Sequence, residues 1–432
     1  MIAALAFMKS RNGSKLGALN EFLPDLSPLK RARDFRLLYF GQMISAFGSA
    51  LTYVVLPIQM YQLTHATVMV GLLSVAEFAP MLLVAFFAGA FADHFDRRQI
   101  ILGCESLMTA VLAMLIGNAL LPHPHVPLLF VAAAILAALN SVHRPAIEAM
   151  TPQLVRPEEM TAVSALNSIR GNAAFIAGPG LAGWVAVTFG PATAFGMDAA
   201  TYLFGIAALL AMRQKKFTGG EEAGLSWHAL SEGWRYALQR KDLLGTYLID
   251  MNAMFFGMPN ALFPAFGDIF GNQNVGWLYS AGPAGALLLS LTSGWTSRLR
   301  RHGMIIAWAA GLWGIAIIGF GLSTSLWLAL MFLALAGAAD MVSGIFRMTL
   351  WNQTIPARLR GRTAAIEMVS YMSGPYLGNA EAGFAARLLG LNTSVVTGGA
   401  LCVLGSVLIT WALPQFRDYR VLPAEPIQSA RP

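Results

Sequence analysis

The chain has 432 residues, of which 56% are hydrophobic and only 12% are charged. A soluble domain carries about 25% charged residues, so this composition excludes a soluble globular protein, whose surface would need more charge. Lys and Arg outnumber Asp and Glu by 29 to 22, a basic excess that favours either nucleic acid or a membrane surface until its distribution is known.

The two cysteines and the N-terminus predict little chemistry. Cys104 and Cys402 both lie in apolar runs, so we expect neither a disulfide framework nor a metal site, and no cofactor. The apolar opening Met1–Phe7 is too short for a signal peptide and has no small-residue cleavage site after it, so we expect an unprocessed chain.

Twelve segments are long and apolar enough to cross a bilayer. A spanning helix needs about 20 mostly apolar residues, because every backbone polar group must be satisfied within the segment. The sequence therefore predicts an all-α integral membrane protein. The predicted spans are Leu37–Gln62, Val68–Phe91, Gln99–Leu121, Pro127–Met150, Thr161–Val187, Pro191–Met212, Leu243–Phe266, Val275–Ser297, Met304–Leu322, Ser325–Phe346, Thr363–Leu389 and Ser394–Leu413.

A polar stretch divides the spans into two groups of six. Within Arg213–Asp242, the segment Leu225–Leu238 has apolar residues at helical spacing and charged residues between them, which indicates an amphipathic helix on the membrane surface. The predicted organisation is an N-terminal segment, a six-helix bundle, a linker, a second six-helix bundle and a tail, at residues 1–36, 37–212, 213–242, 243–413 and 414–432.

Basic residues alternate from one connection to the next. The connections after odd-numbered spans up to the ninth contain no Lys or Arg, whereas those after even-numbered spans and both terminal segments are basic; Arg387 is the one clear departure. Cytoplasmic loops carry the Lys and Arg excess. The alternation predicts that both termini and the linker are cytoplasmic. It also accounts for the basic excess, so nucleic-acid binding has no separate support.

The two groups of six spans contain similar short sequence motifs at corresponding positions. A Gly-initiated basic segment closes the second and eighth spans, an Arg ends the fourth and tenth, and Gly178-Pro179-Gly180 in the fifth corresponds to Gly374-Pro375-Tyr376 in the eleventh. Parallel six-helix repeats are typical of transporters that hold substrate near the midplane between two halves.

At these residues the chain resembles the major facilitator superfamily. Gly89–Arg98 is similar to its signature G-x-L-A-D-R-x-G-R-R, with matches at Gly89, Ala92, Asp93, Arg97 and Arg98, and with Phe91, His94 and Asp96 as departures. Asp93 can hydrogen-bond the end of a neighbouring helix, and Arg97 can pair with a carboxylate. We expect a cytoplasmic gate formed by Asp93, Arg97, Arg98 and Glu148, in which Glu148 reaches Arg97 in the outward-open state. The alternative is that these charges merely anchor a loop.

The resemblance narrows to the branch that contains the enterobactin exporter and macrolide-efflux proteins. It covers roughly Phe35 to Phe416 and rests on the order of short stretches, among them Leu63–Thr67, Glu232–Tyr236, Gly276–Ala281 and Leu359–Arg362. This resemblance implies a monomeric exporter of amphipathic small molecules, siderophore-like or drug-like, that works by proton antiport in the bacterial inner membrane.

The fifth span resembles the Gly-rich antiporter motif. Gly178, Pro179 and Gly183 match it, and Ala182 replaces a Gly. Small residues let transmembrane helices approach closely, which could suppress leakage through an empty carrier. An ordinary tight helix interface explains the same residues equally well.

Carboxylates inside the spans are candidates for proton coupling. Ionisable side chains are costly in the membrane and mark functional sites. Our first candidates are Asp250 and Asp340, the latter two turns before Arg347, and the second are Glu105 and Glu77. Each could instead be the structural partner of an Arg. For His143 and the loop histidines we expect a structural or solvated role. Other acidic residues in the spans are Asp198, Glu367 and Glu381.

The sequence is also compatible with other functions of a membrane protein. No phosphate-binding G-x-x-x-x-G-K-[ST] occurs, which excludes an ATP-driven pump unless a partner supplies the motor. A lysophospholipid or lipid flippase and a facilitative importer are alternatives of the same fold, and an integral-membrane enzyme is a remote one. Transport in reconstituted vesicles distinguishes a carrier from an enzyme.

Topology can be tested directly. A single cysteine introduced between Arg213 and Asp242 should react with a membrane-impermeant maleimide only when the cytoplasmic side is exposed, because the basic residues hold this stretch inside. Labelling of intact cells at that cysteine would contradict the predicted topology.

Overall fold

The computed structural model describes residues 25–94, 96–213, 235–236, 238–355 and 360–420, with side chains except at 85–94, 297 and 360–372. Within these residues every regular element is a helix. Helical chain is present in each of the twelve predicted spans, with a break in the seventh, and nine described helices are long and apolar enough to cross a membrane. The predicted all-helical membrane fold is thus confirmed, while most of the expected amphipathic helix Leu225–Leu238 lies outside the described residues.

The first half of the chain forms six long helices after the short α3 (Ser27–Arg31). These are α4 (Arg33–Thr64), α5 (Thr67–His94), α6 (Arg97–Ala119), α7 (Val126–Met150), α8 (Met160–Phe189) and α9 (Pro191–Leu210). Two 3-10 turns, η2 (Thr151–Gln153) and η3 (Pro157–Glu159), connect α7 to α8. The start of α6 is capped by Asp96, whose side chain accepts a hydrogen bond from the backbone N–H of Arg98.

The second half has six further helical spans, followed by the short α18 (Pro414–Arg417). The first span consists of α11 (Lys241–Phe256), η4 (Asn260–Leu262) and α12 (Phe263–Phe270). After the 3-10 turn η5 (Asn272–Asn274) come α13 (Val275–Leu291), η6 (Ser293–Arg298), α14 (His302–Gly321), α15 (Leu326–Thr354), α16 (Arg360–Leu389) and α17 (Leu391–Ala412).

The seventh predicted span is not one continuous helix. The single helix expected over Leu243–Phe266 is wrong, because the chain leaves the helical path after Phe256 and resumes it at Asn260. Pro259 has no backbone N–H to continue the helix. A broken membrane helix needs other partners for its freed polar groups, and the indole of Trp313 on α14 donates to the carbonyl of Gly257 at 3.1 Å.

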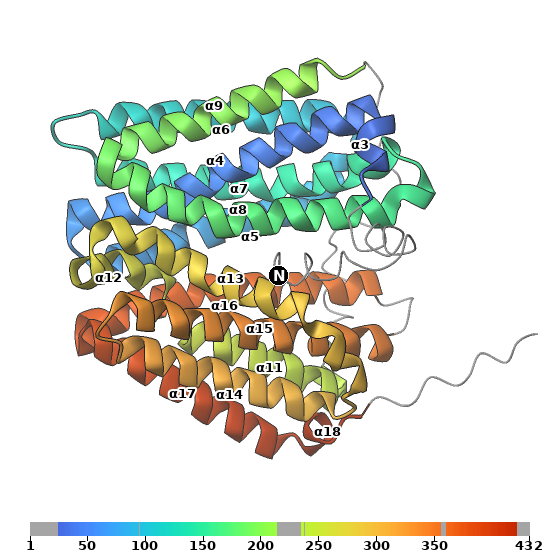
Figure 1. The fold of residues 1–432 in the computed structure, drawn as a ribbon, viewed down its shortest axis with the longest axis vertical. Coiled ribbons are helices and arrows are strands. Elements are labelled where there is room, and N and C mark those ends of the chain that lie inside the picture. Colours follow the sequence, from blue (N-terminus) through green and yellow to red (C-terminus); the bar gives the residue numbers. More distant parts are fainter. Residues whose placement is uncertain (1–24, 95, 214–234, 237, 356–359, 421–432) are drawn as a thin grey trace, which may run out of the picture.

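The helices α4 to α9 gather on one side of the molecule and α11 to α17 on the other (Figure 1). We call the end that carries Arg213 and Arg240 the linker end. The opposite end, called the turn end, holds the positive-φ residues His65, Gly190, Gly271 and Gly390. Glycine adopts such backbone angles without steric cost, which suits the short connections at this end. The residue boundaries of the two bundles remain a prediction.

The two halves meet through close helix crossings near the turn end, α5 with α16 and α8 with α13. Glycines make this approach possible. A Cβ on Gly383 of α16 would lie 2.6 Å from the carbonyl oxygen of Thr67, and one on Gly183 of α8 would lie 2.7 Å from the backbone nitrogen of Gly276. Side chains add to the contact, because the Thr67 hydroxyl donates to the Gly383 carbonyl at 3.0 Å.

Replacing Gly183 with Leu should open the turn end, because the new side chain meets the backbone of α13, which cannot yield. Overpacking of this kind costs about 1–3 kcal/mol. We therefore expect a cysteine at Tyr53 to react about tenfold faster with an impermeant maleimide added from the turn end. Gly171→Leu is the matched control on α8, since no atom lies within 4 Å of a Cβ there. Equal rates in both variants would contradict this role.

Candidate functional site

A cavity of about 710 Å³ lies between the two halves, within the size range of small-molecule sites. Its polar lining includes Ser49, Thr52, Glu77, Asn140, Ser141, Arg144, Glu148 and Asp198. Its aromatic lining consists of Tyr53, Phe175, Tyr202, Trp351 and Tyr376. The cavity therefore combines aromatic surfaces from both halves with polar and charged groups that the first half supplies.

The cavity opens toward the linker end. Arg144 and Glu148, near the end of α7, belong to its lining, and their side chains are 76% and 66% exposed. Toward the turn end the helix crossings close the space, and the hydroxyl of Tyr61 on α4 donates to the Asp268 carboxylate on α12 at 2.8 Å. A ligand in this conformation would enter or leave from the linker end.

Besides Glu148 near the opening, the cavity is lined by two further carboxylates, Glu77 and Asp198. Asp198 is 2% exposed and accepts hydrogen bonds from the hydroxyls of Thr52 and Thr201. Gly48 leaves room for it, since a Cβ there would lie 2.5 Å from its Oδ1. The sequence identified Asp198 as an acid within a span, but its place in the cavity depends on the contact between α4 and α9.

The residues of the expected gate are only partly brought together. Arg97 is buried, and its guanidinium donates to the carbonyl of Ala149. Arg98 donates to the carbonyl of Leu210 at 3.2 Å. Glu148 pairs with Arg144, one helical turn away at 3.0 Å, and the side chain of Asp93 lies outside the described residues. The Arg97–Glu148 contact was expected for a state closed at the linker end, so it remains a prediction.

Asp250, Asp340 and Arg347 form a charged cluster in the second half. The Arg347 guanidinium forms an ion pair with Asp250 of α11 and lies 3.6 Å from the Asp340 carboxylate of α15. The side chains of Asp250 and Arg347 are 7% exposed, and that of Asp340 is 42% exposed. The two first-choice candidates for proton coupling thus share one cation, and Asp340 is the more accessible.

Glu105 forms a second charged cluster in the first half. It is 0% exposed, and its Oε1 accepts from the amide of Gln42 at 2.7 Å and lies 3.2 Å from Nε2 of His143. His143 is only 7% exposed and lies inside α7, so its role is not that of a solvated loop residue. Hydropathy alone missed this pairing, because the two residues are far apart in the chain.

The antiporter-like glycines of α8 lie in helix contacts with both halves. Gly178 faces Ala50 of α4, whereas Pro179 and Gly183 face Gly276 of α13. The expected close packing is present, and the role of this packing in preventing leakage remains a prediction.

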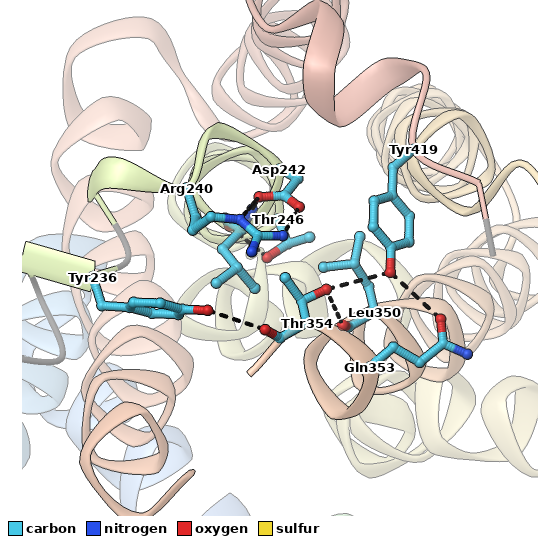
Figure 2. A network of polar contacts seen from close by, with 9 residues as sticks. Tyr236, Arg240, Asp242, Thr246, Leu350, Gln353, Thr354 and Tyr419 are labelled. Carbon is cyan, nitrogen blue, oxygen red and sulfur yellow. Dashed lines mark hydrogen bonds and ion pairs between the residues drawn. The ribbon is translucent and has the colours of Figure 1, made fainter. Parts of the chain in front are cut away.

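A polar network holds the end of α15 at the linker end (Figure 2). The hydroxyl of Tyr236 donates to the Thr354 carbonyl at 3.0 Å, and the hydroxyl of Tyr419 lies 3.3 Å from the Thr354 hydroxyl. On the same turn, the indole of Trp351 donates to Thr246 at 2.9 Å. The linker, the C-terminal segment and α11 therefore all contact the turn that presents Trp351 to the cavity.

The fold and the central cavity define a multi-pass helical membrane transporter of the major facilitator type. Solved structures with this fold include a bacterial homologue of the lysosomal transporter Spinster (TM-score 0.72, 14% identity, 91% of this chain and 100% of that chain). The nucleoside transporter NupG is similar as well (TM-score 0.69, 14% identity, 88% and 98%). At such identities the likeness establishes the fold alone.

Residues 24–430 match the family described as "Transmembrane secretion effector", and the chain belongs to this family. Its relatives include proteins named enterobactin exporter EntS from Shigella boydii serotype 18 and Escherichia coli strain K12. Each is 26% identical over 407 residues, which cover 94% of this chain and 97% of the relative. Both the fold and the family confirm the resemblance seen in the sequence.

Asp250→Asn should destabilise the protein more than Asp340→Asn. The first change removes the carboxylate that pairs most closely with a buried guanidinium, and loss of such a partner costs about 3–5 kcal/mol. The second removes a looser, more exposed partner. Thermal unfolding of the purified variants in detergent measures the difference, and a larger effect of Asp340→Asn would contradict this assignment.

Proposed function

We propose that the chain is a proton-coupled exporter of amphipathic small molecules, acting as a monomer in the bacterial plasma membrane with both termini cytoplasmic. The observation that carries the proposal is the cavity, which is lined by both halves and opens toward the linker end. With the linker end cytoplasmic, as the basic residues predict, this conformation would receive substrate from inside the cell.

The lining of the cavity favours an aromatic substrate that carries hydrogen-bond donors. Tyr53, Phe175 and Tyr376 offer aromatic surface, while Glu77 and Asp198 offer carboxylate oxygens. Carboxylates accept hydrogen bonds from hydroxyl groups and repel anions. The named relatives export enterobactin, and a siderophore in its uncomplexed, hydroxyl-bearing form suits this lining better than an anionic iron complex.

Alternating access would proceed by separation of the halves at the turn end and their approach at the linker end. The contacts that must break include backbone contacts at Gly183 and Gly383, together with the hydrogen bonds of Thr67 and Tyr61. None of these contacts is an ion pair between oppositely charged side chains. Contacts of this kind, which are van der Waals contacts and single hydrogen bonds, suit an interface that must open in every cycle.

Proton coupling is proposed to use Asp340, with Asp250 as the fixed partner of Arg347. One guanidinium can neutralise only one of two carboxylates, and Asp250 is the closer and more buried. A second ionised carboxylate in the same cluster would leave a net negative charge, which is costly in the membrane. The more exposed Asp340 can exchange a proton with water in the cluster's surroundings.

In vesicles loaded with enterobactin as the probe, Asp340→Asn should still exchange substrate down its gradient but accumulate less of it than the wild type under an imposed pH gradient. The amide cannot release a proton, so the proton that Asp340 would carry no longer drives substrate movement. Asp418→Asn is the matched control, because Asp418 is exposed beyond α18 and pairs with Arg417.

Normal pH-driven accumulation by Asp340→Asn would exclude Asp340 as the coupling residue. If the wild-type protein and each single-carboxylate variant ignore the pH gradient, proton antiport is wrong and facilitated diffusion becomes the better explanation.

A further inference from the structure

The buried pair Glu105–His143 differs from the Asp250–Arg347 pair in the cation that compensates the carboxylate. Arg347 is charged at every physiological pH, whereas a histidine gains and loses its charge in that range. Among the described residues, the only ion pair of Glu105 is with His143. The net charge of this cluster therefore depends on one proton, while that of the Asp250–Arg347 pair does not.

The polar contacts of Glu105 converge on one of its two carboxylate oxygens. Its Oε1 accepts a hydrogen bond from the Gln42 amide and lies 3.2 Å from Nε2 of His143. Its Oε2 has no hydrogen-bond partner among the described residues. It lies against Gly205 of α9, where a Cβ would come within 2.8 Å.

Among the described residues, the other groups that contact Glu105 carry no positive charge, and Arg144, next to His143, pairs with Glu148 instead. Helix α4 contributes Gln42 and Ser45, and α9 contributes Gly205 and the phenol of Tyr202. On α6 itself, the neighbouring titratable group is the thiol of Cys104. Thiol and phenol are neutral near pH 7 in ordinary surroundings. An uncompensated buried carboxylate is strongly disfavoured, and among the described residues His143 is the one partner of Glu105 that can gain a positive charge by binding a proton.

The Glu105–His143 pair lies outside the lining of the cavity, and polar residues of α4 extend from the pair to the cavity. Ser141 and Arg144, on either side of His143 in sequence, line the cavity, but Glu105 and His143 do not. Along α4, polar residues continue from Gln42 to Ser49, which hydrogen-bonds Tyr202 at 2.8 Å, and to Thr52, which donates to Asp198. Both Tyr202 and Asp198 line the cavity.

We propose that Glu105 and His143 form a proton site in the first half, separate from Asp340 and occupied in the conformation that opens toward the linker end. The proposal rests on the proposed proton coupling and adds a second proton to it. Because neither residue lines the cavity, this proton would not compete with substrate for the same atoms. It would act through the equilibrium between the two access states.

The charge of His143 can be measured without substrate by NMR of protein labelled with ¹⁵N-histidine. The chain has 7 histidines, and loss of one signal in His143→Gln identifies the resonance. At neutral pH we expect the imidazolium pattern in the wild type and the neutral pattern in Glu105→Gln. Glu77→Gln is the control, a carboxylate of the cavity that does not pair with His143.

A neutral His143 in the wild type, or an imidazolium unaffected by Glu105→Gln, would reduce the pair to a structural hydrogen bond and overturn the proposal. Thermal unfolding identifies a variant that has lost its fold. If Glu105→Gln does not fold, Gln42→Leu should change the His143 signal, because it removes the other donor to the same oxygen.

Transport tests the second proton. With enterobactin as the probe, each coupled proton multiplies the limiting accumulation about tenfold per unit of pH gradient. His143→Gln should therefore accumulate about tenfold less than the wild type at a gradient of one unit, while it still exchanges substrate. Unchanged accumulation would overturn the proposal. If the wild type fails to accumulate enterobactin but His143 keeps its Glu105-dependent charge, the proposed function fails and the proton site stands.

Discussion

The close approach of helix backbones near the turn end is the constraint on which the rest of the structure depends. At Gly183 and Gly276, and again at Gly71 and Gly383, a single added Cβ would collide with the backbone of the other half. Apolar side chains gain little from each other in lipid, so helix contacts there depend on tight packing of small residues. These crossings join the halves at one end and leave the space that becomes the cavity toward the other.

The buried charges follow a second constraint, because the membrane demands that each be neutralised. The two halves meet this demand differently. In the second half a permanent cation, Arg347, lies between Asp250 and Asp340. In the first half the partner of Glu105 is His143, whose charge is conditional. In the proposed mechanism, Asp340 would carry the proton of the second half, and the Glu105–His143 pair would carry that of the first.

The last turn of α15 connects the cavity to the segments outside the bundles. Trp351 lines the cavity, stacks on Tyr247 with ring centroids 5.5 Å apart and donates to Thr246. Three residues further along α15, the carbonyl of Thr354 accepts a hydrogen bond from Tyr236, and its hydroxyl lies beside that of Tyr419 (Figure 2). A change in the position of α15 would therefore alter the contacts of Tyr236 at the end of the linker and of Tyr419 in the C-terminal segment.

The sequence by itself determined the class of protein, the positions of the spans and the family resemblance, because a membrane span is a local property of about 20 consecutive residues. It also named Asp250, Asp340 and Glu105 as unusual acids. Only the tertiary structure decided that Arg347 lies between the first two, that His143 pairs with the third and that the seventh span breaks at Gly257. Partners such as Glu105 and His143 belong to different helices, and their meeting depends on how those helices cross, which no local window of sequence contains.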